Sequence, residues 1–169
     1  MITQHEIRLA CEADAQPIAC MSRDCIEHGL GWSWRPARVR RSIADASTNV
    51  VVCREAGGLA GFAIMKYGDE EAHLLLLAVG AHRRRRGVGT ALMAWLEATA
   101  RTAGLGVIRL ETRRTNVGAQ VFYRRLGYRQ IARVPGPISS IRNQSSPAGA
   151  AQRDIGRGSS RPGASSMKS

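Results

Sequence analysis

The chain has 169 residues and is 44% hydrophobic, which suits one globular domain with a substantial core. Its net charge of +12 predicts an anionic partner: a nucleic acid, an acidic surface or a polyanionic small molecule. No apolar run approaches the roughly 20 residues of a membrane span, and the N-terminus does not resemble a signal peptide. We therefore expect a cytoplasmic protein, in which the four cysteines would be free thiols. Their spacing matches no zinc pattern, so no metal site is predicted.

The chain is expected to begin with a strand and two helices. Residues 7–14 predict a short strand. Residues 15–29 carry apolar side chains at helical spacing and end at Gly29, a residue that commonly follows a helix. Residues 35–46 predict a second helix with Pro36 near its first turn.

Three strands are predicted next. Residues 49–55 are rich in β-branched side chains, and residues 59–67 follow after a turn of the kind that closes a hairpin. Residues 72–79 form a nearly continuous apolar run, which is typical of a central strand buried on both faces.

The second half alternates helices and strands. Residues 87–104 predict an amphipathic helix, residues 107–113 a strand, residues 116–127 a helix and residues 128–134 a last strand. The order β-α-α-β-β-β-α-β-α-β indicates a mixed α/β (α+β) domain around one sheet.

A change of composition at Pro135 predicts the end of this domain. Residues 135–169 are rich in Ser, Gly, Pro, Ala and Arg, and no aromatic residue follows Tyr128. Such a segment buries too little apolar surface to offset the entropy lost on ordering. We therefore expect one domain over residues 1–134 and a disordered basic tail over residues 135–169.

Four consecutive arginines, Arg83 to Arg86, lie between a predicted buried strand and an amphipathic helix, beside Gly87 and Gly89. The first amides of a helix have no intrahelical acceptor, and glycines let a ligand approach the main chain, so this context predicts a phosphate cradle. No lysine follows the glycines as in a Walker loop, and Leu92 stands where a dinucleotide fingerprint needs its last glycine. A solvated basic turn or a nucleic-acid patch is the alternative.

The pattern Arg84-x-x-Gly87-x-Gly89 between a strand and a helix resembles the acyl-CoA loop of the GNAT superfamily of N-acetyltransferases. The segment "LETRRTNVGAQVFYRRLGY", residues 110–128, is similar to the second half of that family's signature. The resemblance covers about residues 5–134. Within the family, the chain is most similar to the bacterial ribosomal-protein alanine N-acetyltransferases.

The resemblance implies a mostly antiparallel central sheet with helices on both faces and a parallel pair of strands splayed at an acetyl-CoA site. It implies main-chain contacts to the pantetheine arm from the end of one strand. Asn116 heads a helix, and both a helix N-cap and a cofactor contact fit it. The cofactor-binding residues implied are Leu77, Ala78, Val79, Arg84, Arg85, Arg86, Gly87, Val88, Gly89, Thr90 and Asn116.

Two catalytic residues are implied by the same resemblance. Tyr123 would act as the general acid that returns a proton to the CoA thiolate, although a core tyrosine beside Phe122 is the alternative. Glu111 would act as the general base, directly or through water, although a surface carboxylate paired with a neighbouring arginine is the alternative. A main-chain amide around Val79 would stabilise the oxyanion. Trp32 and Trp34 lie where this fold often borders the acceptor groove, and packing against the core is the alternative.

These implications describe an N-acetyltransferase that moves acetyl from acetyl-CoA to a primary amine by direct attack in a ternary complex. A protein N-terminal α-amine, such as that of a ribosomal protein, is the expected acceptor. A small-molecule amine is the alternative, as is an impaired enzyme that binds nucleic acid or the ribosome through its basic tail. The family usually ends with a further strand, and residues 136–151 show no strand pattern, which predicts an exposed sheet edge.

Overall fold

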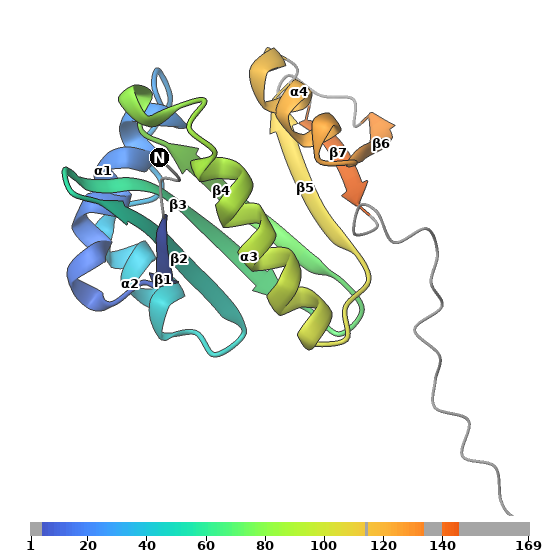
Figure 1. Ribbon diagram of the computed structural model, residues 1–169, viewed down its shortest axis with the longest axis horizontal. Coiled ribbons are helices and arrows are strands. Elements are labelled where there is room, and N and C mark those ends of the chain that lie inside the picture. Colours follow the sequence, from blue (N-terminus) through green and yellow to red (C-terminus); the bar gives the residue numbers. More distant parts are fainter. Residues whose placement is uncertain (1–4, 114, 134–139, 146–169) are drawn as a thin grey trace, which may run out of the picture.

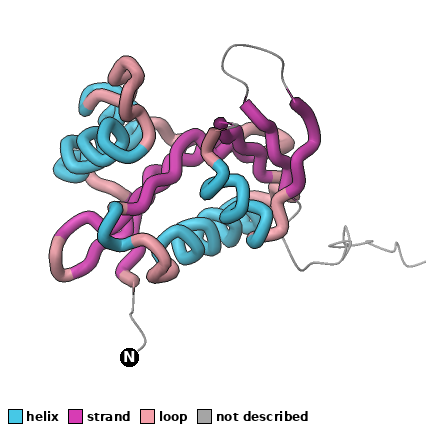
Figure 2. The backbone as a smooth tube through the Cα atoms, turned by 90° about the horizontal axis from the view of Figure 1, so that it is seen from above, coloured by secondary structure: helices cyan, strands magenta, loops and turns pink. Residues whose placement is uncertain are grey.

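The computed structural model describes residues 5–113, 115–133 and 140–145, which form one seven-stranded sheet with helices on both faces (Figures 1 and 2). The strand order is β1-β2-β3-β4-β5-β7-β6, and all neighbours are antiparallel except the parallel pair β4 and β5. This arrangement confirms the predicted fold class. The strands are β1 (Glu6–Leu9), β2 (Thr48–Glu55), β3 (Gly58–Tyr67), β4 (Ala72–Val79), β5 (Ile108–Arg113), β6 (Arg129–Arg133) and β7 (Ser140–Ser145).

The helices α1 (Ala15–Cys25) and α2 (Pro36–Ala44) cover one face of the sheet, and α3 (Val88–Thr102) and α4 (Val117–Arg125) cover the other (Figure 2). Each face has its own core. Leu92 and Leu96 of α3 pack with Leu110 of β5, whereas Ile18 of α1 and Val39 of α2 pack in the second core. The sheet is therefore a shared wall between two apolar layers.

The parallel pair β4 and β5 separates toward the ends of both strands. Its register runs from Ala72 opposite Ile108 only as far as Leu74 opposite Leu110. The register of β4 with β3 shifts at this point, where Leu76 pairs with Ile64 and Leu74 with Met65, so Leu75 is the extra residue of a bulge. A bulge bends its strand and increases the local twist. This irregularity accounts for the splay between the two strands.

The prediction that β4 is buried on both faces was wrong. Buried and half-buried residues alternate along the strand, and Leu75, Leu77 and Val79 belong to the half-buried set. Among the described residues, the last residues of β4 have no strand partner on the side of β5, and they line the cleft. The apolar run of residues 72–79 therefore belongs to a strand that lines a cleft on one side, and not to a strand covered on both faces.

Several element ends differ from the predicted ones. β1 ends at Leu9, because a short 3-10 helix, Glu12–Asp14, takes over the chain before α1. The Asp14 carboxylate accepts hydrogen bonds from the Cys11 amide (2.8 Å) and from Arg8 (2.7 Å), which fixes this turn. α1 ends at Cys25, four residues before Gly29.

The prediction that no strand follows residue 134 was also wrong. β7 lies between β5 and β6, and Glu111 of β5 pairs with Arg142 while Gln130 of β6 pairs with Asn143. Backbone pairing on both sides stabilises a segment whose Ser, Asn and Gln residues have low strand propensity. The domain therefore extends beyond residue 134. Residues 135–139 and 146–169 of the predicted tail lie outside the described residues.

All four cysteines are unpaired. Within the described ranges, no three His, Cys, Asp or Glu side chains are grouped so as to hold a metal ion. None of the described helices is both long and apolar enough to cross a bilayer.

Candidate active site

A cleft of about 1350 Å3 opens between the splayed ends of β4 and β5. Its walls come from the end of α1, from β4, from β5, from α4 and from the loop that contains Arg83 to Arg86, which we call the arginine loop. All but one of the site residues predicted from the sequence lie in this lining, and Arg86 is the exception. Those present are Leu77, Ala78, Val79, Arg84, Arg85, Gly87, Val88, Gly89, Thr90, Glu111, Asn116 and Tyr123.

The main chain at the start of α3 has the form of an anion cradle. Gly87 caps the helix in the left-handed conformation with a φ of 80°, and Arg85 has a φ of 60°. The first intrahelical bond runs from the Ala91 amide to the Gly87 carbonyl (2.9 Å), so the amides of Val88, Gly89 and Thr90 precede it. The first turn has no acidic side chain, and no side chain caps it. Its positive end is open to an anion from the cleft.

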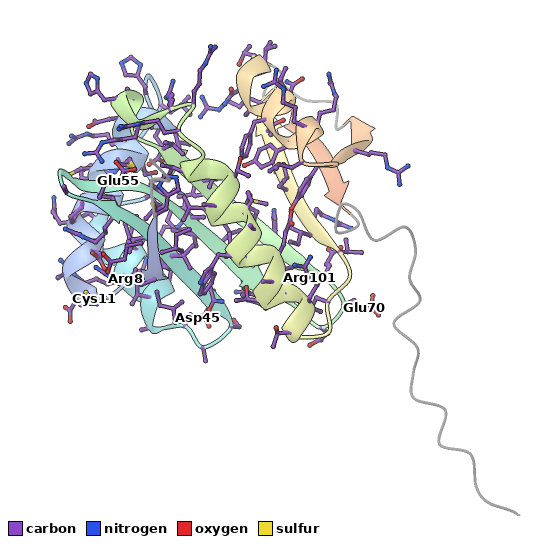
Figure 3. The ribbon with its side chains drawn as sticks, viewed as in Figure 1. Arg8, Cys11, Asp45, Glu55, Glu70 and Arg101 are labelled. Atoms are coloured by element: carbon purple, nitrogen blue, oxygen red, sulfur yellow. The ribbon has the colours of Figure 1, made fainter. Side chains whose placement is uncertain are left out.

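A half-buried carboxylate at the end of β2, that of Glu55, anchors the arginine loop. Glu55, which is labelled in Figure 3, forms ion pairs with Arg83 and with Arg86 (3.9 Å), and His5 Nδ1 lies 3.4 Å from its Oε1. The Nε2–H of His5 donates to the Arg86 carbonyl (2.9 Å). Arg83 and Arg86 are therefore engaged with the protein. Arg84 and Arg85 are exposed in the cleft lining, where they can meet an anionic ligand.

Gly89 joins the two halves of the sequence signature. A Cβ at this position would lie 3.2 Å from the ring of Phe122 on α4 and 3.5 Å from Val79 on β4. A glycine here lets α4 pack against the first turn of α3. The loop and the segment 110–128 therefore meet at this contact, which explains why they form one cleft although a helix separates them in the chain.

Asn116 is the N-cap of α4. Its side-chain oxygen accepts a hydrogen bond from the Ala119 amide at 3.1 Å, which is the usual role of Asn at this position. The residue also lies in the cleft lining. The predicted role of Asn116 as a helix N-cap is confirmed, and its contact with the cofactor stays a prediction.

Tyr123 is both a core residue and a cleft residue. It is 7% exposed and packs edge-on against Phe122, with ring centroids 5.1 Å apart. Burial raises the pKa of Tyr123 above its ordinary value, so the phenol is protonated at neutral pH. Among the described residues, none forms a hydrogen bond with its hydroxyl, although the residue lines the cleft.

Glu111 lies on the opposite face of β5 from Tyr123. Leu110 and Thr112 are buried, and Leu110 shares a core with Tyr123, whereas Glu111 between them is exposed. Its neighbour Arg109 forms an ion pair with Glu71 at 2.9 Å. A carboxylate and a phenol therefore approach the cleft from two sides of one strand.

Thr112 is a cleft residue that the sequence analysis missed. It is 7% exposed, and its hydroxyl has no hydrogen-bond partner among the described residues. Leaving a buried hydroxyl unpaired costs about 1–3 kcal/mol. The signal was present in "IRLETR", where a polar residue follows Ile108 and Leu110 at the alternating position that points inward.

The end of α1 was also missed as part of the site. Cys25, Ile26 and His28 line the cleft beside Arg84. Burial raises the pKa of the Cys25 thiol, although the nearby Arg84 opposes this effect. Trp32 and Trp34, for which the sequence left both the acceptor groove and packing against the core open, are not in the lining. Trp34 is buried in the second core and Trp32 packs against it, as the core alternative predicts.

The model of the acetyltransferase (GNAT) family matches residues 10–128. No curated protein sequence matches the chain significantly. Among solved structures, Ard1 from Thermoplasma volcanium is 26% identical with a TM-score of 0.73, and the match covers 83% of this chain and 96% of that one.

Two further structures share the fold at lower identity. The PaiA N-acetyltransferase from Thermoplasma acidophilum, in complex with coenzyme A, is 18% identical with a TM-score of 0.75, covering 85% of this chain and 100% of that one. The ribosomal-protein-S18-alanine N-acetyltransferase from Escherichia coli is 21% identical with a TM-score of 0.71, covering 89% and 98% respectively. The family model spans both halves of the signature and the cleft between them. The chain therefore belongs to the GNAT family and is an N-acetyltransferase whose acyl donor is acetyl-CoA.

Proposed function

We propose that the protein acetylates the α-amino group of a peptide or protein, by direct attack on acetyl-CoA in a ternary complex. The observation that carries this proposal is that Glu111 projects from one face of β5 while Tyr123, from α4, lies on the other face, at a cleft formed by the splay of β4 and β5. A thioester lying between the strands would have the amine on the side of Glu111. Its departing sulfur would then face Tyr123.

The donor would be held by the cradle and the open edge of β4. The pyrophosphate would accept hydrogen bonds from the amides of Val88, Gly89 and Thr90, with Arg84 and Arg85 beside it. The main chain of β4 beyond Leu74 has no strand partner on the side of β5, so it can pair with the pantetheine arm as an added strand would. An amide near Val79 would then stabilise the oxyanion.

The charge of the lining favours an α-amine over a lysine. Its described residues include five arginines and one carboxylate, that of Glu111; Arg83 is paired with Glu55, which leaves four arginines against Glu111. A positive potential disfavours the charged form of an incoming amine, and it repels polycationic small molecules. At pH 7.5 roughly a third of an α-amine is already neutral, against about 0.1% of a lysine side chain. A weak carboxylate base therefore suffices for an α-amine.

The acceptor class can be tested with two matched peptides. We expect the protein to acetylate a peptide with a free N-terminal Ala. It should not react with the same peptide when the N-terminus is blocked and one lysine is present. Mass spectrometry locates the added acetyl group. Modification of the lysine alone, or of a small polyamine in preference to both peptides, would overturn the proposal. A cytoplasmic location is part of this proposal, and the four free thiols support it.

Thr112 gives a test of the donor position. Replacing Thr112 with Val removes an unpaired buried hydroxyl, so we expect the free energy of unfolding of the unliganded protein to rise by about 1 kcal/mol. If the hydroxyl bonds to a pantetheine amide, the dissociation constant of acetyl-CoA should rise roughly 3- to 10-fold.

Denaturant unfolding and calorimetric titration measure the two effects of this change separately. A Thr112→Ser variant keeps the hydroxyl and should retain the wild-type affinity for acetyl-CoA. An unchanged affinity in Thr112→Val would show that the hydroxyl does not contact the donor.

A further inference from the structure

A row of arginines lies on α2, away from the cleft. Arg35, at the N-cap, and Arg38 and Arg41 within the helix are three residues apart and all exposed, so they neighbour one another along one side of it. None of the three forms an ion pair with any residue that the structure describes. Arg40, on another side of the helix, lies 3.9 Å from Glu12. We call Arg35, Arg38 and Arg41 the arginine row.

Two tryptophans support the guanidinium groups of this row. Arg38 lies 3.9 Å above the ring of Trp34, and Arg35 lies 5.5 Å from the ring of Trp32. Stacking uses one plane of a guanidinium group and leaves its edge N–H groups able to donate. One of these donors is already used, since Arg35 Nε donates to the Trp32 carbonyl at 3.3 Å. The outer plane of the Arg38 guanidinium is also free for a second flat group.

The segment between α1 and α2 holds these tryptophans in place. The buried Glu27 carboxylate accepts hydrogen bonds from the Ser33 amide (2.8 Å), the Trp34 amide (3.2 Å) and the Ser22 hydroxyl (3.2 Å). These bonds hold the pKa of Glu27 below its ordinary value even though burial alone would raise it. These hydrogen bonds therefore fix the position of the segment against which Arg35 and Arg38 stack.

Helix stability does not account for these charges. Arg35 and Arg38 lie at the N-terminal end of α2, where the helix dipole disfavours cations, and the first turn has no acidic residue. Adjacent like charges on one side of a helix are also destabilising. Val39 is the buried side chain of α2, and its packing in the core does not require the arginines on the exposed side of the helix.

We propose that the arginine row is a binding surface for single-stranded RNA. Its edge donors match phosphate oxygens, and a guanidinium fixed on an indole offers its outer plane to an unpaired base. The carboxylates of an acidic peptide would satisfy the charges but supply no aromatic ring to stack on that plane. Because α2 covers the face of the sheet opposite α3, the surface is separate from the phosphate cradle. The proposal does not depend on the acceptor of the acetyl group.

The test compares two double variants of the full chain. Arg38→Gln with Arg41→Gln removes two charges from the arginine row. Arg101→Gln with Arg124→Gln removes two exposed charges from α3 and α4, across the sheet; Arg101 is labelled in Figure 3. Fluorescence anisotropy measures the binding of an unstructured RNA of about 15 nucleotides between about 50 and 200 mM salt, with acetyl-CoA present to occupy the cleft.

We expect the dissociation constant for RNA to rise about 10-fold in the first variant and less than about twofold in the second. The slope of log K against log salt should fall by about 1.4 in the first variant alone, since two phosphate contacts are lost. Equal losses in both variants, or none in either, would overturn the proposal and point to the tail, with Arg153, Arg157 and Arg161. Equal binding of a glutamate oligopeptide at the same surface would overturn the assignment to RNA.

Discussion

Replacing Gly89 with Asp is expected to abolish measurable binding of acetyl-CoA, a loss of affinity of about 100-fold or more. Two effects combine. The new Cβ would lie 3.2 Å from Phe122 and force its ring away from α3, which disturbs the contact between the two halves of the site. The carboxylate would also stand among amides that point at the pyrophosphate, and like charges repel strongly where donors are already committed to an anion.

Two further variants separate these effects. Gly89→Ala adds the Cβ without the charge, and we expect a loss of about 10-fold or less, because a Cβ at 3.2 Å requires a shift of only a few tenths of an ångström. Ala94→Asp adds the same charge to an exposed site on the same helix, outside the cleft, and should bind acetyl-CoA as the wild type does. Calorimetric titration gives the affinities, and circular dichroism verifies the fold. Wild-type affinity in Gly89→Asp would exclude the cradle as the phosphate site.

The sequence predicts the site well where local rules apply. Gly87 and Gly89 before an amphipathic helix define a cradle from backbone chemistry alone, and Asn116 before a helix defines a cap. Ten strands and helices of the fold were likewise predicted from the sequence pattern, to within a few residues at most ends, as were the tight turns between β2, β3 and β4.

What the sequence did not predict depends on contacts between distant residues. β7 has a polar sequence and forms because β5 and β6 offer it backbone partners on both sides. The engagement of Arg83 by Glu55 could not be predicted, since it joins residues 28 apart, and it decides which arginines remain for a ligand. Thr112 was visible as a polar residue at an inward position, but only the splay of β4 and β5 makes that position a cleft.

Replacing Tyr123 with Phe should lower kcat about 100-fold while the KM for acetyl-CoA changes less than about twofold. The phenyl ring keeps the packing against Phe122 and Tyr128, whose ring centroids lie 5.1 and 5.7 Å away, so the fold should survive. The hydroxyl is what is lost, and it has no hydrogen-bond partner among the described residues. Steady-state kinetics with a peptide acceptor measures the effect.

Tyr128→Phe is the matched control. Its hydroxyl donates to Glu97 at 3.1 Å, it lies outside the cleft lining, and its ring is buried like that of Tyr123. Removing that hydroxyl should lower the free energy of unfolding by about 1 kcal/mol and leave kcat unchanged. If both variants lose kcat equally, Tyr123 acts only through packing.

The protonation state of Tyr123 gives this prediction a second readout. Burial disfavours the phenolate and raises the pKa of Tyr123, so the group stays protonated as the pH rises past the ordinary value of about 10. A thiol ionises near pH 8.5, so complete proton transfer from the phenol to CoA is uphill, and the phenol acts first by donating a hydrogen bond to the developing thiolate. The wild-type enzyme should therefore show no loss of kcat between pH 8 and about 10 from ionisation of this tyrosine. A descending limb in that range that disappears in Tyr123→Phe would contradict the buried, protonated phenol and with it this role.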